Sequence, residues 1–124
     1  MPVQSYRELE VWQRGMALGR LAWRLTASFP QQEIYGMTSQ IRRAAASIPA
    51  NIAEGSGRHY PAEFIQFLRK ANGSRTELET HLLLCVEVSL ATAEQVQPLL
   101  DETEILGRQL LSLERSIARK ANGE

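Results

Sequence analysis

The stretch TAEQVQPLLDETEILGRQLLSLERSI, residues 92–117, decides the fold class. Its apolar positions recur at alternating intervals of three and four residues, which is the spacing of a packing seam along one face of a long α-helix. The seam residues are Val96, Leu99, Thr103, Leu106, Leu110, Leu113 and Ile117. Thr92-Ala93-Glu94-Gln95 matches a capping box at the start of this helix. Pro98 leaves open a short separate first turn, and Gly107 is the weakest helix-forming position in the seam.

Three more segments with helical periodicity precede this stretch. Turn-forming residues separate the segments: Phe29-Pro30, Gly55-Ser56-Gly57 and Leu90-Ala91-Thr92. The predicted helices span about residues 7–28, 33–56, 61–90 and 93–119. Because no strand-like alternation, internal repeat or long linker lies between them, the sequence predicts an all-α protein with one domain over residues 1–124.

The first predicted helix has a broad apolar arc and a basic sector. Leu9, Trp12, Met16, Gly19 and Trp23 are expected to form its buried face, which Val11, Leu18, Ala22 and Leu25 widen. The remaining sector gathers four arginines, namely Arg7, Arg14, Arg20 and Arg24. This sector is the best candidate for a basic binding face, and a solvated helix surface is the alternative interpretation.

The second predicted helix is apolar or small on nearly every side. Its apolar stripe comprises Met37, Ile41, Ala45, Ile48, Ile52 and Gly55, and Ala46, Ala50 and Ala53 occupy a flank. Its polar line comprises Gln40, Arg43, Ser47, Asn51, Glu54 and Arg58. A helix with so little polar surface is expected to be covered on several sides, which favours a subunit interface in a protein this short. Pro49 is expected to kink the helix, leaving Ser47 to bond the local backbone or to contact a ligand.

The third predicted helix begins at Pro61 and carries one residue that breaks its pattern. Its apolar face comprises Phe64, Phe67, Leu68, Ala71, Leu78, Leu82, Cys85 and Val86. Glu63, Lys70, Ser74, Glu77 and His81 form an adjacent polar stripe. Arg75 falls on the apolar side, where its guanidinium must reach solvent or pair with Glu79 or Glu54.

The composition is that of an ordinary globular domain. Hydrophobic residues make up 44% of the 124 residues, charged residues make up 23%, and the formal net charge is zero. This balance excludes a disordered chain and a uniformly basic nucleic-acid coat. Residues 1–60 carry seven arginines against four acids, whereas residues 61–124 carry seven basic side chains against ten acids. This uneven charge has two explanations. The basic and acidic halves attract each other within the bundle or between subunits, or the basic half forms a local surface for nucleic acid.

The same composition predicts a cytoplasmic protein that is not embedded in a membrane. No apolar stretch approaches the roughly 18–20 residues that span a bilayer, and the first ten residues lack the pattern of a signal peptide. A single cysteine, Cys85, excludes an internal disulfide and is expected to be a buried, inert thiol.

The chain offers no constellation that predicts catalysis. It contains no phosphate-binding glycine loop, nucleophile elbow or zinc-protease signature, so we expect a protein that is not an enzyme and needs no cofactor. Glu54, Glu77 and His81 provide too few ligands for the di-metal site of carboxylate bundles, and no metal is expected. The Trp and Tyr residues sit at core spacing or near helix ends, and the sequence predicts no aromatic platform for stacking bases.

Four segments carry a family resemblance: YRELEVW (6–12), YGMTSQIRRA (35–44), SIPANIAEG (47–55) and ANGSRTELE (71–79). Together they resemble the bacterial four-helix-bundle family encoded in intervening sequences of large-subunit (23S) ribosomal RNA genes. The resemblance implies an antiparallel up-down four-helix bundle that assembles into a homopentameric ring, without established enzymatic activity. It also implies kinship with the accessory variability protein of diversity-generating retroelements, which is thought to bind nucleic acid and a reverse transcriptase.

The resemblance adds a second set of candidate residues. The matched motif positions are Ser47, Asn51, Glu54, Gly55, Ser74 and Glu77, and their expected role is to bond the second and third helices within or between subunits. The candidate nucleic-acid contacts are Arg7, Arg14, Arg20 and Arg24 with Arg42 and Arg43. We therefore expect a non-catalytic, oligomeric bundle that binds RNA or DNA through this arginine-bearing face. The alternative is a purely structural or protein-binding scaffold with no nucleic-acid contact.

Overall fold

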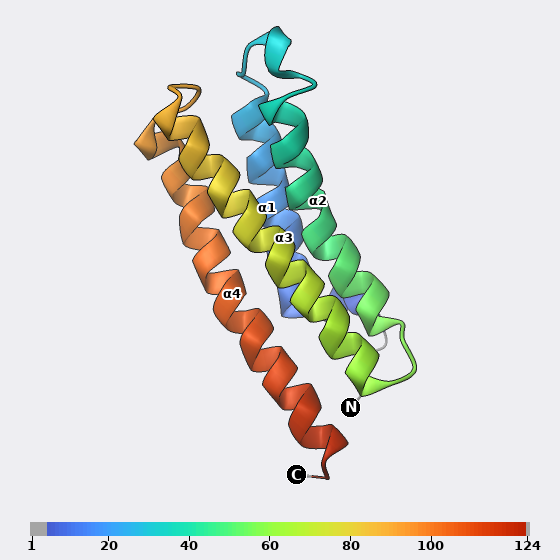
Figure 1. Cartoon of the computed structure of the whole chain (residues 1–124). Coiled ribbons are helices and arrows are strands. Elements are labelled where there is room, and N and C mark those ends of the chain that lie inside the picture. The colour runs from blue at the N-terminus through green and yellow to red at the C-terminus, as the bar shows by residue number, and fades with distance from the viewer. Residues whose placement is uncertain (1–4, 124) are drawn as a thin grey trace.

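The structure, a computed structural model, describes residues 5–123. Within that range four α-helices, two short 3-10 helices and no β-strand are found. Their bounds are η1 (Tyr6–Glu8), α1 (Glu10–Thr26), η2 (Gln31–Glu33), α2 (Met37–Ser56), α3 (Pro61–Glu87) and α4 (Ala93–Ala121). The helices lie side by side and alternate in direction, so that each short connection joins neighbours, as Figure 1 shows. The predicted all-α architecture of four helices is confirmed.

The first two helices begin later than the sequence predicted. Residues from Tyr6 to Glu8 form η1, whose first amide groups are capped by the hydroxyl of Ser5, and an extended Leu9 separates η1 from α1. Residues Gln31–Glu33 form η2 in the same way ahead of α2. The Glu33 carboxylate accepts a hydrogen bond of 3.2 Å from the Met37 amide and so caps α2. At α1 a local 3-10 turn replaces the predicted first turn, whereas at α2 residues 34–36 form a non-helical turn between η2 and the helix.

The connection between α3 and α4 is set by two caps. α3 ends at Glu87 instead of residue 90, because Ser89 adopts a left-handed conformation with φ of 62°. The Leu90 amide then donates to the Cys85 carbonyl and the Ser89 amide to the Val86 carbonyl, the two bonds of a Schellman motif. α4 opens with the predicted capping box, in which Thr92 and Gln95 each bond the other's backbone amide. The helix continues through Pro98 to Ala121, so no separate first turn forms.

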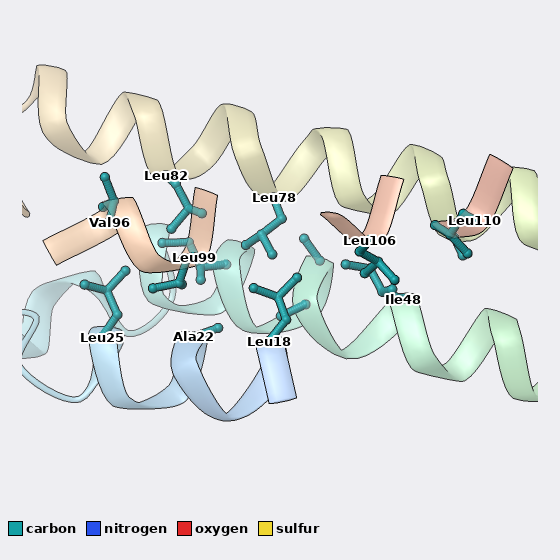
Figure 2. Packing of buried hydrophobic residues seen from close by; sticks show 14 of the residues in the cluster. Leu18, Ala22, Leu25, Ile48, Leu78, Leu82, Val96, Leu99, Leu106 and Leu110 are labelled. Atoms are coloured by element: carbon teal, nitrogen blue, oxygen red, sulfur yellow. The ribbon is translucent and has the colours of Figure 1, made fainter. Parts of the chain in front are cut away.

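The core runs along the axis of the bundle and contains residues from every α-helix. Figure 2 shows Leu25 of α1 opposite Val96 of α4, Leu18 of α1 near Leu78 of α3, and Ile48 of α2 beside Leu106 of α4. The predicted seam of α4 is confirmed, because Val96, Leu99, Thr103, Leu106 and Leu110 are buried, while Leu113 and Ile117 are partly buried. The predicted stripe of α2 is likewise buried, apart from a half-buried Met37.

The buried face of α1 differs from the prediction. Its buried residues are Val11, Gly15, Leu18, Ala22, Leu25 and Thr26. Met16 and Trp23, which the sequence placed at the centre of the buried face, are 40% and 45% exposed. The side of α1 that bears Gly15 faces α2, where a methyl group on Gly15 would be in ordinary van der Waals contact with Ile48 and Pro49 at 3.5 Å. The bulkier side chains are therefore left at the edge of the interface.

The Arg75 side chain of α3 packs in the space beside Gly107 of α4. The Arg75 guanidinium bonds to Asn72 and Glu79 on its own helix and reaches across to the Thr103 carbonyl of α4. A methyl group at Gly107 would lie 2.7 Å from the Arg75 Cζ atom, so the glycine provides the space that the guanidinium occupies. Of the two partners that the sequence allowed, Glu79 is the one used, and the residue that weakens the α4 seam is required by the arginine on α3.

Candidate nucleic-acid interface

Two of the six predicted arginines are engaged in holding the bundle together. Arg14 of α1 forms an ion pair with Glu102 of α4 and donates a hydrogen bond of 3.0 Å to the Gln109 side chain. Arg42 of α2 donates a hydrogen bond of 2.8 Å to the hydroxyl of Thr26, a buried residue at the end of α1. These contacts join α1 to α4 and α2 to α1, so both guanidinium groups have protein partners that a phosphate would have to displace.

Arg7 lies apart from the other arginines. It belongs to η1, ahead of α1, and its guanidinium lies 5.9 Å from the centre of the Tyr6 ring. At a rise of 1.5 Å per residue, the start of α1 at Glu10 and Arg24 are about 21 Å apart along the helix. The structure therefore does not bring the six arginines together on one continuous face.

The other three arginines are exposed and have no ion pair within residues 5–123. Arg20 and Arg24 lie one turn apart on the outer side of α1, and Arg43 lies on the outer side of α2. Exposed guanidinium groups without carboxylate partners are the ones able to contact phosphate at the lowest desolvation cost. Of the six predicted arginines, Arg20, Arg24 and Arg43 are therefore the candidates for contact with nucleic acid.

A groove follows the seam between α1 and α2, and Arg20 and Arg43 line it, whereas Arg24 does not. We call it the α1/α2 groove. Its first hollow, of about 320 Å³, is lined by Gly15, Met16, Gly19, Arg20 and Trp23 of α1 and by Ala45, Ala46 and Pro49 of α2. Its second hollow shares Trp23 and Ala46 with the first and adds Ile34, Thr38, Ser39, Arg42 and Arg43. The described lining residues include three arginines and no carboxylate, so the groove has an apolar floor and a basic rim.

Small residues create the groove. A methyl group at Gly19 would meet no atom within 4 Å, which shows that this part of the seam is open. Opposite it, α2 presents Ala45, Ala46 and Pro49. Side chains this short cannot cover Trp23, so the indole stays 45% exposed between the two hollows.

The indole of Trp23 and the guanidinium of Arg42 form a pair. The Arg42 Cζ atom lies 5.1 Å from the centre of the Trp23 ring, within the range of a cation–π contact. The sequence predicted no aromatic platform for stacking bases, and it did not single out this pairing of one tryptophan with one arginine. The missed signal was the run of small residues on the facing helix, which leaves a bulky aromatic side chain uncovered.

The six positions of the shared motif bond mainly within their own helices. Ser47 donates to the Ala44 carbonyl, Asn51 donates to the Ser47 carbonyl, Glu54 pairs with Arg58, and Glu77 lies 3.3 Å from His81. Ser47 thus makes the local backbone bond that the sequence allowed, and α2 passes through Pro49 to Ser56 as one helix. Ser74 is half-buried on α3.

Gly55 is the motif residue that connects α2 with α3. A methyl group there would lie 2.6 Å from the Phe67 Cβ atom and 3.3 Å from the Phe64 carbonyl oxygen. Only a glycine allows the two helices to approach this closely at this point. Bonding by the other five motif residues to another subunit remains a prediction.

Cys85 and the acidic groups show no arrangement typical of a catalytic or metal centre. Burial in the core, with a smaller effect from the negative charge of Glu33, raises the pKa of the Cys85 thiol from 9.0 to about 11. A thiol with this pKa is protonated and unreactive near neutral pH. In the part of the chain that the structure describes, no three His, Cys, Asp or Glu side chains converge as metal ligands. No helix among the described residues is long and apolar enough to cross a membrane.

The fold and the groove define a small helical-bundle protein with an arginine-rimmed surface groove. Residues 7–112 match the family described as 23S rRNA-intervening sequence protein, and the chain belongs to this family. The chain is also similar to the crystal structure of a protein of unknown function from the S23 ribosomal protein family of Bacteroides thetaiotaomicron. That comparison has a TM-score of 0.74 and 25% sequence identity, and covers 84% of this chain and 97% of the other. No curated protein matches.

Proposed function

We propose that the protein is a non-catalytic bundle that binds nucleic acid through Arg20, Arg24 and Arg43. The observation that carries the proposal is the basic rim of the α1/α2 groove, where exposed Arg20 and Arg43 have no ion pair among the described residues. Arg24 lies outside the lining of the groove, one turn from Arg20 on α1, and is also exposed. Phosphate contacts by guanidinium groups supply most of the affinity in sequence-independent binding. RNA is the first ligand to test, because the name of the family refers to ribosomal RNA.

We further propose that the protein acts as a homo-oligomer, expected to be the pentameric ring that the family resemblance implies. A second exposed apolar surface supports self-association: Leu83, Leu84 and Val88, near the end of α3, are each between 44% and 55% exposed. Repetition of three arginines around a ring would let weak phosphate contacts add through avidity. We also propose that the protein is located in the cytoplasm and that one of its partners is a reverse-transcriptase-like protein.

The second candidate function is a purely structural or protein-binding scaffold. It is favoured by the zero net charge and by the two arginines, Arg14 and Arg42, that serve the bundle itself. In this case the apolar floor of the groove would be covered by protein and the exposed arginines would serve solvation. The two candidates differ in how binding responds to replacement of the exposed arginines.

Fluorescence anisotropy with a structured ribosomal RNA fragment at low salt tests the choice. The test variant is Arg20→Gln/Arg24→Gln/Arg43→Gln. The control is Arg115→Gln/Arg119→Gln/Lys120→Gln, which removes the same charge from exposed positions of α4. We expect the test variant to bind at least tenfold more weakly and the control to bind much like the wild type. Equal weakening of both variants would indicate a non-specific charge effect, and absence of binding by folded wild type would support the scaffold.

A further inference from the structure

We propose that the α1/α2 groove takes an unpaired nucleotide, whose base stacks on the Trp23 indole while its phosphates meet Arg20 and Arg43. This inference rests on the proposed function and narrows the ligand from nucleic acid in general to a single strand or an unpaired loop. It also gives a role to the exposed Trp23, which phosphate contacts by arginines alone do not explain.

Trp23 is held in place in a way that suits stacking. Arg42 lies across the ring at 5.1 Å, and its Nε atom donates to the Thr26 hydroxyl. That hydroxyl in turn donates to the Ala22 carbonyl at 2.8 Å, and Thr26 is buried. The indole and the guanidinium are thus ordered before any ligand arrives, which reduces the entropy lost on binding.

The space beside the indole has a mainly apolar lining. The first hollow lies against Trp23 and has a floor of Gly19, Ala46 and Pro49, none of which carries a polar side chain. A nucleobase has two apolar faces, and stacking of a base on an aromatic side chain tolerates any base sequence. Arg20 lines the same hollow and Arg43 lines the second one, so a strand that crosses the groove meets a positive charge on each side of the indole.

The positive charge and the apolar lining of the α1/α2 groove together favour one kind of ligand. The groove requires a partner with a flat apolar face and negative charge, since three arginines and no carboxylate are among its described lining residues. A duplex keeps its base faces inside the helical stack, whereas unpaired nucleotides can turn them outward onto a side chain. A second copy of this chain, presenting an acidic and apolar segment, is the competing occupant, and the experiment separates it from RNA.

The experiment uses Trp23 as its own probe. The chain has two tryptophans, so the Trp12→Phe variant leaves Trp23 as the only indole. We would titrate this variant with a single-stranded oligouridylate and with a blunt-ended RNA duplex of equal length that has no unpaired nucleotides, following tryptophan fluorescence. The inference predicts quenching by the single strand at low salt and much weaker quenching by the duplex.

Affinity measurements on Trp23 variants complete the test. Trp23→Leu keeps the apolar bulk but removes the aromatic ring, and should weaken binding of the single strand by about 5- to 150-fold. The slope of affinity against salt should stay that of the wild type, because the phosphate contacts remain. Trp23→Phe should recover part of the affinity. Tyr60→Leu, at an exposed aromatic residue in the connection between α2 and α3, is the matched control and should change nothing.

The possible failures are distinguishable. If Trp23→Leu binds as tightly as the wild type while the triple arginine variant binds weakly, stacking is wrong and the proposed function stands. If folded protein binds neither RNA, both proposals fail. If acrylamide cannot quench Trp23 in the free protein and Trp23→Leu dissociates the oligomer, a second copy occupies the groove and the inference is overturned.

Discussion

The contact between Gly55 and Phe67 gives a sharp prediction about how α2 and α3 pack. A methyl group at Gly55 would lie 2.6 Å from the Phe67 Cβ atom, whereas carbon atoms in favourable contact lie about 3.5–4.0 Å apart. The overlap is therefore roughly 1 Å. The Cβ atom is bonded directly to the α3 backbone, so no change of rotamer relieves the overlap and the helices must separate. Overpacking of this kind costs about 1–3 kcal/mol.

A second glycine isolates this packing cost from the helix propensity of alanine. Gly73 lies inside α3, and a methyl group there would meet no atom within 4 Å. Gly73→Ala should therefore stabilise the protein by up to about 1 kcal/mol through propensity alone. Gly55→Ala gains at most the same stabilisation from helix propensity, but it is also destabilised by the overlap with Phe67. Its free energy of unfolding should therefore be lower than that of Gly73→Ala by about 2 kcal/mol.

Urea denaturation followed by circular dichroism, at one fixed protein concentration, measures both variants. We expect the midpoint of Gly73→Ala to lie above that of the wild type and the midpoint of Gly55→Ala to lie below it, with similar denaturant slopes. Coincident midpoints for the two variants would show that α2 and α3 do not approach each other as closely as described.

Three further predictions concern stability and thiol reactivity. Leu106→Ala should lower the free energy of unfolding by about 2–5 kcal/mol, because Leu106 is fully buried in the α4 seam, and a loss below about 0.5 kcal/mol in denaturation would refute the seam. Thr92→Ala removes the hydroxyl of the capping box and should cost about 1 kcal/mol by the same assay, whereas Thr92→Ser should be close to neutral. The pKa of the Cys85 thiol rises from 9.0 to about 11 on folding, so the stability it contributes is complete below about pH 9 and is lost as the pH rises toward 11. Disulfide-exchange reagents at pH 8 should accordingly modify Cys85 slowly in the native protein and rapidly in urea, and equal rates would contradict its burial.

The sequence allowed the helices to be predicted well because their signals are local. The spacing of apolar residues in α4 and the capping box at Thr92 depend on neighbours within one or two turns, and both are confirmed. The start of α1 was misplaced because a 3-10 turn and an α-helical first turn have similar sequences, and the start of α2 was misplaced because residues 34–36 form a turn.

The buried face of α1 could not be predicted from its own periodicity. Its apolar arc is too broad to show which side is buried, and that side is known only from the contacts of α1 with other helices, such as Gly15 with Ile48 and Pro49. Arg75 looked anomalous for the same reason, because the glycine that makes room for it lies on α4.

The candidate site was predicted in part. Arginines on α1 and α2 were the right residues to consider, yet their separation into structural and exposed groups depends on Glu102, Gln109 and Thr26, which come from distant parts of the chain. The partial exposure of Trp23 likewise follows from the small residues of α2 that face it. Contacts between helices, which single-sequence periodicity does not report, decide both features.

The salt dependence of RNA affinity tests the central proposal most directly. The wild-type association constant for a single-stranded RNA should fall linearly with salt on logarithmic axes, with a slope of about −0.7 for each phosphate neutralised. The Arg20→Gln/Arg24→Gln/Arg43→Gln variant should show a slope shallower by up to about 2, whereas the α4 control variant should keep the wild-type slope. An unchanged slope in the arginine variant would contradict the account, because it would mean that these three side chains do not contact the phosphates.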